Sequence, residues 1–163
     1  MRRSLALLAL LTAGLGCGDP APPPAPDQPV AFSHKLHAGD NEIGCTMCHA
    51  YAEHSTVAGI PSMGRCRGCH RFVAKDKPEI QKFLDAGAGD DDRPVAWNRV
   101  HRLPDHVYFA HERHVAAGLR CQPCHGEVQT MDTARQVAPL TMGWCVDCHR
   151  ERGADTGCIV CHK

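Results

Sequence analysis

The chain has 163 residues and a formal charge of zero, with eighteen basic and eighteen acidic side chains. A balanced charge gives no support to nucleic-acid binding, and the length is that of a single domain. Aromatic residues make up 5% of the chain, so two tryptophans and four phenylalanines cannot build a large core. The unusual part of the composition is its eleven cysteines and twelve histidines.

The N-terminus has the pattern of an export signal. Arg2 and Arg3 form a basic start, and an apolar run follows from Leu5 to Leu11. This run is shorter than the ~20 residues that a membrane-spanning helix requires. We predict a signal peptide over residues 1–16 and interpret the two arginines as ordinary positive charge rather than as a twin-arginine signal.

Cys17 is the one cysteine outside the repeated motif described below. Its context, Gly14-Leu15-Gly16-Cys17, resembles the lipobox of bacterial lipoproteins, in which the cysteine becomes the acylated N-terminus. The twelve residues that follow are half proline, as expected of an extended tether. We predict that Cys17 carries a lipid and that residues 17–29 link it to the rest of the chain. Several acyl chains on one residue make membrane attachment stable.

From Val30 onward the sequence contains an internal repeat. The pattern V-x-F-x-H-x-x-H occurs at residues 30–37 and again at 107–114. The pattern M-G-x-C-x-x-C-H-R occurs at residues 63–71 and 142–150. Such a repeat indicates duplication of one supersecondary unit.

The segment between the two copies contains one predicted helix. An N-cap residue at Asp76, a proline at Pro78 and a glycine at Gly87 delimit it. Its inward face is expected to consist of Ile80, Phe83 and Leu84. The acidic run at residues 90–92 is expected to be a solvated loop. We therefore expect one domain over residues 30–163, made of related halves at 30–75 and 101–163 and a helix with connector at 76–100.

Ten of the eleven cysteines lie in five copies of Cys-x-x-Cys-His. Two thiols three positions apart can add to the two vinyl groups on one edge of a haem, and the adjacent histidine can then ligate its iron. Disulfides, a thioredoxin-like pair or zinc sites would each leave that histidine unexplained. We predict five covalently attached c-type haems, bound through Cys45, Cys48, Cys66, Cys69, Cys121, Cys124, Cys145, Cys148, Cys158 and Cys161, with proximal ligands His49, His70, His125, His149 and His162.

The other seven histidines are candidate distal ligands for five irons. This supply predicts two imidazoles on every iron, which gives low-spin centres without an open site and lower potentials than a His/Met pair. No catalytic residue is predicted. We expect His106 to be surplus, and Met63 and Met142 to pack beside haem rather than bind iron. The distal candidates are His34, His37, His54, His101, His111 and His114.

In V-x-F-x-H-x-x-H the two histidines are three apart, so on a helical turn they can reach two neighbouring haems. This resembles the small multihaem cytochromes of class III. The resemblance implies a mostly irregular fold with short α-helices and a core built around five haems. It also implies that His34 serves the haem at Cys45, His111 the haem at Cys121 and His114 the haem at Cys145. The haems at Cys66 and Cys158 are left to histidines among His37, His54 and His101.

Four stretches resemble the pentahaem cytochrome subunit of alternative complex III. They are residues 32–39, 52–62, 97–109 and 139–149, and the similarity covers nearly all of residues 30–163. The resemblance implies a membrane-bound quinol-oxidising complex, with an iron-sulfur subunit similar to molybdopterin oxidoreductases and polytopic quinol-binding subunits as partners. Electrons would leave to a monohaem cytochrome c or a terminal oxidase, on the periplasmic side of the bacterial inner membrane.

Two other classes of protein share part of this pattern. A free-standing lipid-anchored or periplasmic electron shuttle would use the same haems and differ in its partner surfaces. A pentahaem nitrite reductase has an open haem, usually with a lysine in place of a motif histidine, and a far longer chain. All five motifs here end in histidine, so we predict an electron-transfer protein that is not itself an enzyme.

Overall fold

The structure of the protein, a computed structural model, describes residues 21–86 and 95–163. Its regular elements are η1 (Lys35–Asp40), α1 (Cys45–Cys48), α2 (Met63–His70), α3 (Pro78–Ala86), α4 (His111–Ala116), α5 (Gln122–His125), η2 (Val128–Thr130), α6 (Met142–Glu151) and α7 (Cys158–Cys161). η1 is a π-helix and η2 a 3-10 helix. Within the described ranges there is no strand, only an isolated antiparallel bridge between Val107 and His162. The prediction of a mostly irregular chain with short helices is confirmed.

Three predicted features lie outside the described residues. They are the signal peptide at 1–16, the lipidated Cys17 and the acidic run at 90–92. Among the helices that are described, none has the length and apolar character needed to cross a membrane.

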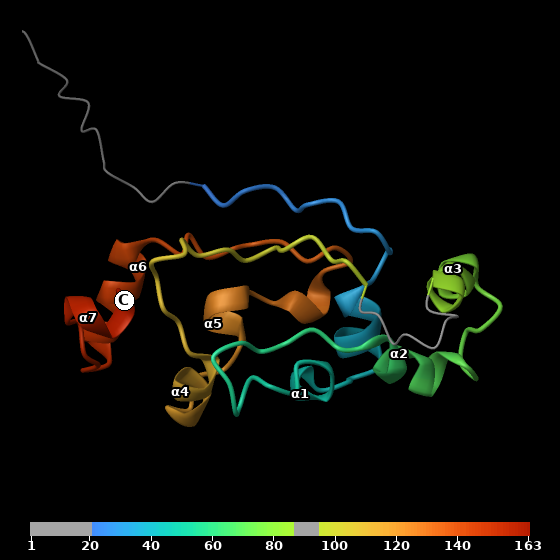
Figure 1. Cartoon of the computed structure of the whole chain (residues 1–163), viewed down its shortest axis with the longest axis horizontal. Helices are drawn as coiled ribbons and strands as arrows, with labels where there is room; N and C mark the ends of the chain where they lie inside the picture. The colour runs from blue at the N-terminus through green and yellow to red at the C-terminus, as the bar shows by residue number, and fades with distance from the viewer. Residues whose placement is uncertain (1–20, 87–94) are drawn as a thin grey trace, which may run out of the picture.

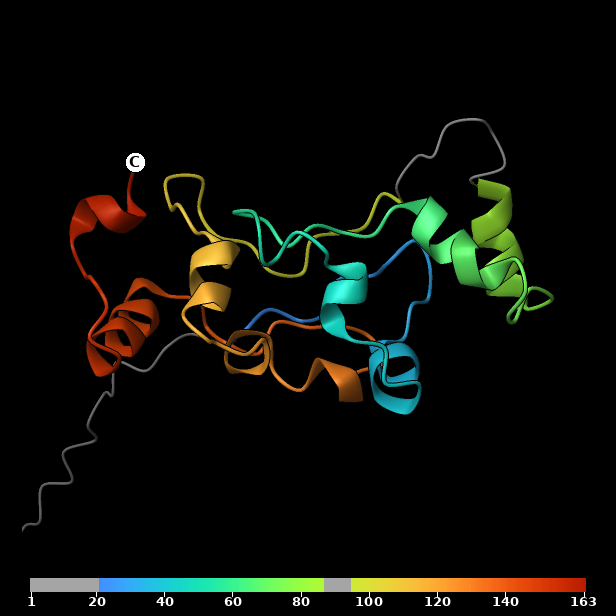
Figure 2. The same cartoon turned by 90° about the horizontal axis from the view of Figure 1, so that it is seen from below.

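The molecule is elongated, and the helices that carry Cys-x-x-Cys-His follow one another along its long axis. Figures 1 and 2, two views at right angles, both show the order α2, α1, α5, α6, α7 from one end to the other. α3 stands beyond α2 at one end, and α7 occupies the other (Figure 1). The order in space therefore differs from the order in the chain, where α1 comes before α2.

α3 is the predicted connector helix. Pro78 occupies its first position, where a missing N–H leaves no hydrogen bond unmade. The carbonyl of Lys77 accepts the first helical hydrogen bonds, so Lys77 rather than Asp76 stands at the N-cap position, one residue later than predicted. The predicted inward face is confirmed: Phe83 is 5% exposed, and Ile80 and Leu84 are half-buried.

η1 packs against η2, and this contact joins the two sequence halves. Lys35 N donates to Met131 O at 2.9 Å, and Ser33 Oγ donates to Asp132 Oδ1 at 2.9 Å. The backbones come so close that a Cβ on Gly39 would collide with the carbonyl oxygen of Gln129. A side chain at Gly39 is therefore incompatible with this contact.

α4 makes the second connection between the halves. His111 N donates to Thr56 O at 3.2 Å, and Glu112 N donates to Ser55 O at 3.1 Å. The loop that follows the first motif is thereby held against the start of α4. The division of the domain into segments 30–75, 76–100 and 101–163 stays a prediction. The first and last of these segments are in direct contact through the hydrogen bonds described above.

The end of the predicted tether is bound to the connector. Gln28 Nε2 donates to Asn98 O at 2.8 Å, and Asn98 N donates to Gln28 Oε1 at 2.9 Å. Asn98 Nδ2 also donates to Asp27 O at 2.7 Å. Phe32 then meets Trp97 edge-on, with ring centres 6.2 Å apart.

The polypeptide buries few of its own apolar side chains. In the described residues the buried ones are Met63, Phe83, Ala110, Met131 and Ala138. Large apolar side chains are exposed instead, including Phe72 at 76% and Ile159 at 81%. Folded chains of this length ordinarily bury most of their apolar surface, so the protein interior must be completed by groups other than side chains.

Candidate haem-binding centres

One helical turn arranges each Cys-x-x-Cys-His motif. The bond from the histidine N–H to the carbonyl of the first cysteine is 2.9 Å long in the first motif, 3.0 Å in the third and 2.9 Å in the fifth. In α2 and α6 the motif lies inside a longer helix. Residues three and four apart share a helix face, so each motif directs two thiols and an imidazole to one side.

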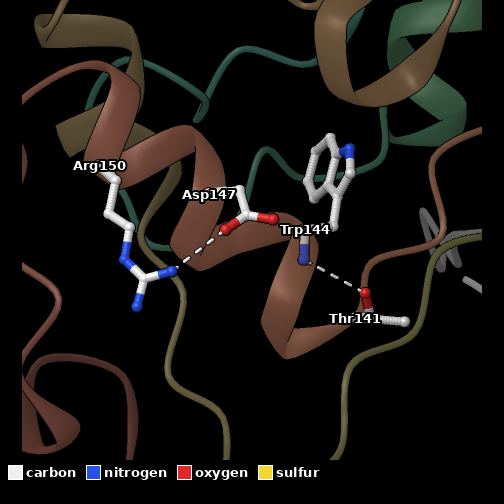
Figure 3. Close-up of polar contacts among 4 residues, drawn as sticks. All are labelled: Thr141, Trp144, Asp147 and Arg150. Atoms are coloured by element: carbon white, nitrogen blue, oxygen red, sulfur yellow. Dashed lines mark hydrogen bonds and ion pairs between the residues drawn. The ribbon is translucent and has the colours of Figure 1, made fainter. Parts of the chain in front are cut away.

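α2 and α6, the helices of the second repeat pattern, begin at equivalent methionines. Ser62 and Thr141 hold their N-cap positions in extended conformation. In α6 the Thr141 Oγ1 accepts a hydrogen bond from Trp144 N at 3.3 Å (Figure 3), a cap that typically contributes about 1 kcal/mol. Arg150 Nη1 lies 3.3 Å from Asp147 Oδ1 (Figure 3), and both side chains are 69% exposed, so this pair adds at most about 1 kcal/mol.

The two copies of V-x-F-x-H-x-x-H have the same geometry. Phe32 meets His34 edge-on at 4.9 Å between ring centres and stacks on His37 at 4.4 Å. Phe109 meets His111 edge-on at 4.8 Å and stacks on His114 at 4.3 Å. One phenylalanine thus orients both histidines of each copy.

Four motif histidines have a second histidine at a similar distance between ring centres. Ring centres are separated by 6.0 Å in His37–His70, 6.3 Å in His111–His125, 6.1 Å in His114–His149 and 5.6 Å in His106–His162. An iron between two imidazoles requires two metal–nitrogen bonds of about 2.0 Å each, with each ring centre about 1.1 Å behind its nitrogen, hence about 6 Å. These separations fit an iron bound by both rings.

The remaining motif histidine, His49, lies near His34. Burial lowers the pKa of His34, and the neighbouring His49 and His37 lower it further. Each of the five motif histidines therefore has at least one histidine from elsewhere in the chain as a neighbour, and His125 has two.

Most of these imidazoles are held through Nδ1 by a backbone carbonyl. A carbonyl only accepts hydrogen bonds, so the ring proton is on Nδ1, and Nε2 keeps the lone pair that a metal requires. The acceptors are Ser33 O for His37 (2.8 Å), Gly59 O for His49 (2.7 Å), Val73 O for His70 (3.1 Å), Thr56 O for His111 (2.9 Å), Ala110 O for His114 (2.8 Å), Asp155 O for His149 (2.6 Å) and His106 O for His162 (3.3 Å).

Two predicted distal ligands are placed differently. His101 lies 4.4 Å from His125 between ring centres, with planes 81° apart, which leaves no room for an iron between the rings. Its Nε2 is instead 3.3 Å from His125 Nδ1. The side chain of His54 is 75% exposed, and its Nε2 lies 4.0 Å from a carboxylate oxygen of Glu53. His106, expected to be surplus, is the histidine that faces His162.

Burial keeps the central imidazoles neutral. It lowers the pKa of His125 to about 4, helped by His101, His111 and His49. Burial, and then His111, also lower the pKa of His101. Neutral imidazole is the form that binds iron, so the folded chain favours the state that ligation needs.

Thiols of different motifs lie close to one another. Burial raises the pKa of four motif thiols, and in each case a thiol of another motif raises it further: Cys69 beside Cys48, Cys45 beside Cys121, Cys148 beside Cys124 and Cys161 beside Cys145. The motifs are therefore neighbours in the order second, first, third, fourth, fifth. This is the order of the helices along the long axis in Figures 1 and 2.

Two buried side-chain nitrogens in the described part of the chain have no hydrogen-bond partner. They are His34 Nδ1 and Arg67 Nη2. Buried polar atoms are nearly always paired, so each of these nitrogens requires an acceptor or donor that the described part of the chain does not supply. Of the two methionines expected beside haem, Met63 is 2% exposed and Met142 is 67% exposed.

No pattern in the sequence indicated that His106 would lie beside the motif histidine His162. It lies just ahead of the second V-x-F-x-H-x-x-H element, but no helical spacing connects it to a motif. The contact of Val107 and Tyr108 with the last motif brings it there: Tyr108 N donates to Cys161 O at 2.7 Å.

Comparison with known proteins gives two matches. Residues 107–163 match the family described as cytochrome c7 and related cytochrome c. The chain is also 29% identical, over 84% of its own length and 77% of the relative's, to the protein named menaquinone reductase, multiheme cytochrome c subunit, of Nitratidesulfovibrio vulgaris.

The motifs and both matches describe the same kind of protein. The chain is an electron-transfer protein that is similar to multihaem cytochromes c, and it is not an enzyme by itself. Covalently bound c-type haem is the cofactor of that type of protein. Both predictions are thereby confirmed in this general form.

Proposed function

We propose that the chain carries five covalently attached haems, each with two histidine ligands, and passes electrons for a membrane quinol-oxidising complex. The observation that carries the proposal is that each motif histidine has a second histidine as a neighbour, with about 6 Å between ring centres in four cases. A disulfide framework has no use for such pairs, and in the part of the chain that the structure describes no three Cys, His, Asp or Glu side chains are grouped as a zinc site requires.

Five pairs of histidines would hold the irons. We assign them as His34 with His49, His37 with His70, His111 with His125, His114 with His149 and His106 with His162. The last pair is the shortest, but the side chain of His106 is exposed and therefore has space to adjust. His54 and His101 are left without an iron.

Bound haem would supply an iron that alternates between two oxidation states and so carries one electron at a time. The residues of the chain have a supporting role. Carbonyls such as Ser33 O and Ala110 O keep Nε2 of His37 and His114 available, and two ligands per iron leave no site for substrate. Exposed apolar residues such as Met142 and Ile159 would cover porphyrin surface.

The order of the motifs in space supports a single row of centres. The second motif lies at the end near α3, the fifth motif at the other end, and the first and third motifs meet in the middle (Figure 1). Neighbouring motifs are close enough for their thiols to affect each other's pKa. Electrons would therefore enter at one end of the row and leave at the other.

The partners are proposed from two similarities. The relative named as a subunit of menaquinone reductase supports a role next to a membrane quinone. The resemblance to alternative complex III adds an iron-sulfur subunit similar to molybdopterin oxidoreductases, polytopic quinol-binding subunits, and a monohaem cytochrome c or oxidase as acceptor. We place the protein on the periplasmic side of the inner membrane, exported by residues 1–16 and anchored through Cys17.

Two alternatives remain in the same class. The name of the relative specifies reduction of menaquinone, so electrons could run through the same row toward the quinone. A free-standing lipid-anchored shuttle would use the same haems without a complex. Both alternatives keep the haem ligands proposed above and change only the partners.

The test begins with the native protein. Membranes are solubilised in mild detergent, the cytochrome is isolated with whatever remains bound, and haem content is measured by mass. We expect a mass corresponding to five haems, a low-spin spectrum, co-purifying iron-sulfur and polytopic subunits, and reduction by added quinol. Oxidation of the reduced protein by added quinone, without reduction by quinol, would favour the reverse direction. A cytochrome that comes off alone and responds only to soluble donors would favour the shuttle.

A further inference from the structure

We propose that His101 is a positioning residue for the central haem. It accepts a hydrogen bond from the motif histidine His125 and thereby lowers the reduction potential of the haem held by Cys121 and Cys124. The inference rests on the proposed function, because it requires a haem at this motif. It gives a role to one of the two histidines that have no iron of their own.

The geometry shows a hydrogen bond and not a shared metal. His125 Nδ1 and His101 Nε2 are 3.3 Å apart, and the two rings meet nearly at right angles. His111 is the partner of His125 that lies across an iron-sized gap, 6.3 Å between ring centres. His125 therefore has two histidine partners with separate roles, because His111 is the second iron ligand and His101 is the acceptor for its N–H.

The bond is unusual among the motif histidines. The other four donate Nδ1–H to backbone carbonyls, of Gly59, Val73, Asp155 and His106. Only His125 has a side-chain nitrogen as acceptor among these five. A side-chain acceptor can be exchanged by mutation while the backbone stays in place, so its effect on the haem can be measured.

The direction of the effect follows from ligand basicity. An acceptor at Nδ1–H increases electron density on the imidazole and makes it a stronger donor to iron. Stronger donation stabilises the ferric state more than the ferrous state, so it lowers the potential. A side chain that cannot accept should therefore raise the potential of one haem out of five. The third motif stands in the middle of the row, so the change affects electron passage between the two halves.

The experiment compares three variants of the intact holoprotein: His101→Leu, which cannot accept, His101→Gln, whose amide oxygen can, and His54→Leu as a matched control at an exposed histidine. Haem content is measured by mass, spin state by low-temperature EPR, and the five potentials by a redox titration followed in the visible spectrum. We expect His101→Leu to keep five low-spin haems and to shift the reduction equilibrium of one of them roughly tenfold toward the ferrous state, about 59 mV for one electron. His101→Gln should reverse most of this shift, and His54→Leu should cause none.

Three outcomes overturn the inference. Unchanged potentials in His101→Leu would show that the contact has no influence on the haem. A high-spin haem in that variant would show that His101 is an iron ligand. Failure of both His101 variants to assemble five haems would show a purely structural residue. A wild-type protein without five low-spin haems would instead contradict the proposed function, so the two failures are distinguishable.

Discussion

Phe109 lies flat against His114, with ring centres 4.3 Å apart and planes 27° from parallel. Phe32 holds His37 in the same way, at 4.4 Å and 21°. In both copies the stacked histidine also donates Nδ1–H to the carbonyl four residues earlier, at 2.8 Å. The repeated pattern therefore encodes a rigid unit in which one aromatic ring orients two histidines.

Replacing Phe109 should loosen both histidines that it contacts. Phe109→Leu removes the flat face against His114 and the edge contact with His111, so we expect partial high-spin character in the haems of the third and fourth motifs. Loss of a half-buried aromatic ring should also cost about 1–3 kcal/mol of folding free energy. EPR and thermal unfolding measure the two effects. Phe72→Leu is the matched control, because Phe72 is 76% exposed; equal effects in both variants would contradict the orienting role.

His106 should be the ligand opposite His162. In His106→Leu we expect one of the five haems to become high-spin and to bind carbon monoxide when reduced, because one coordination position opens. The other four haems should keep their spectra. EPR and a carbon monoxide titration give the number of affected haems. His54→Leu is the control and should leave all five haems low-spin. A high-spin haem in His54→Leu together with five low-spin haems in His106→Leu would assign the fifth iron to His54.

The row of motifs predicts that an end haem is easier to remove than a middle one. Cys158→Ser with Cys161→Ser should leave four low-spin haems, because α7 is joined to the rest mainly through Tyr108 and Val107. Cys121→Ser with Cys124→Ser removes the centre between the first and fourth motifs and should lower stability much more.

Mass spectrometry, visible spectra and rapid-mixing reduction compare these two double variants. The end variant should be reduced in the same kinetic phases as the wild type, with a total amplitude that is smaller by one haem. The middle variant should show two separate populations of haem that equilibrate slowly. Similar kinetics in the two variants would contradict the linear order.

Gly39 should tolerate no side chain. Gly39→Ala places a methyl group against the carbonyl oxygen of Gln129, a backbone atom that cannot move away without shifting η2. We expect a loss of about 1–3 kcal/mol, visible as a lower melting temperature by circular dichroism. At Gly44 a Cβ meets nothing within 4 Å, so Gly44→Ala should melt close to the wild type. A stable Gly39→Ala variant would show that the contact between η1 and η2 is loose.

The sequence by itself determined the chemistry of the centres. Five Cys-x-x-Cys-His motifs specify local geometry that a single helical turn completes, since the bond from histidine N–H to cysteine carbonyl lies within each motif. The V-x-F-x-H-x-x-H repeat is equally local, which explains why its two copies have the same ring contacts. The helix at Pro78–Ala86 was likewise predictable from its boundary residues and its apolar face.

Only the tertiary structure decided which histidines meet and in what order the motifs stand. His106 reaches His162 through a bridge between segments 55 residues apart, and His101 reaches His125 from the irregular connector. Neither contact has a periodic signature, because it depends on how irregular segments cross rather than on helix geometry. The order second, first, third, fourth, fifth likewise arises from the packing of η1 against η2 and of α4 against Ser55 and Thr56. Spacing along a chain specifies a ligand set within one helical turn, whereas long-range backbone contacts specify its partners.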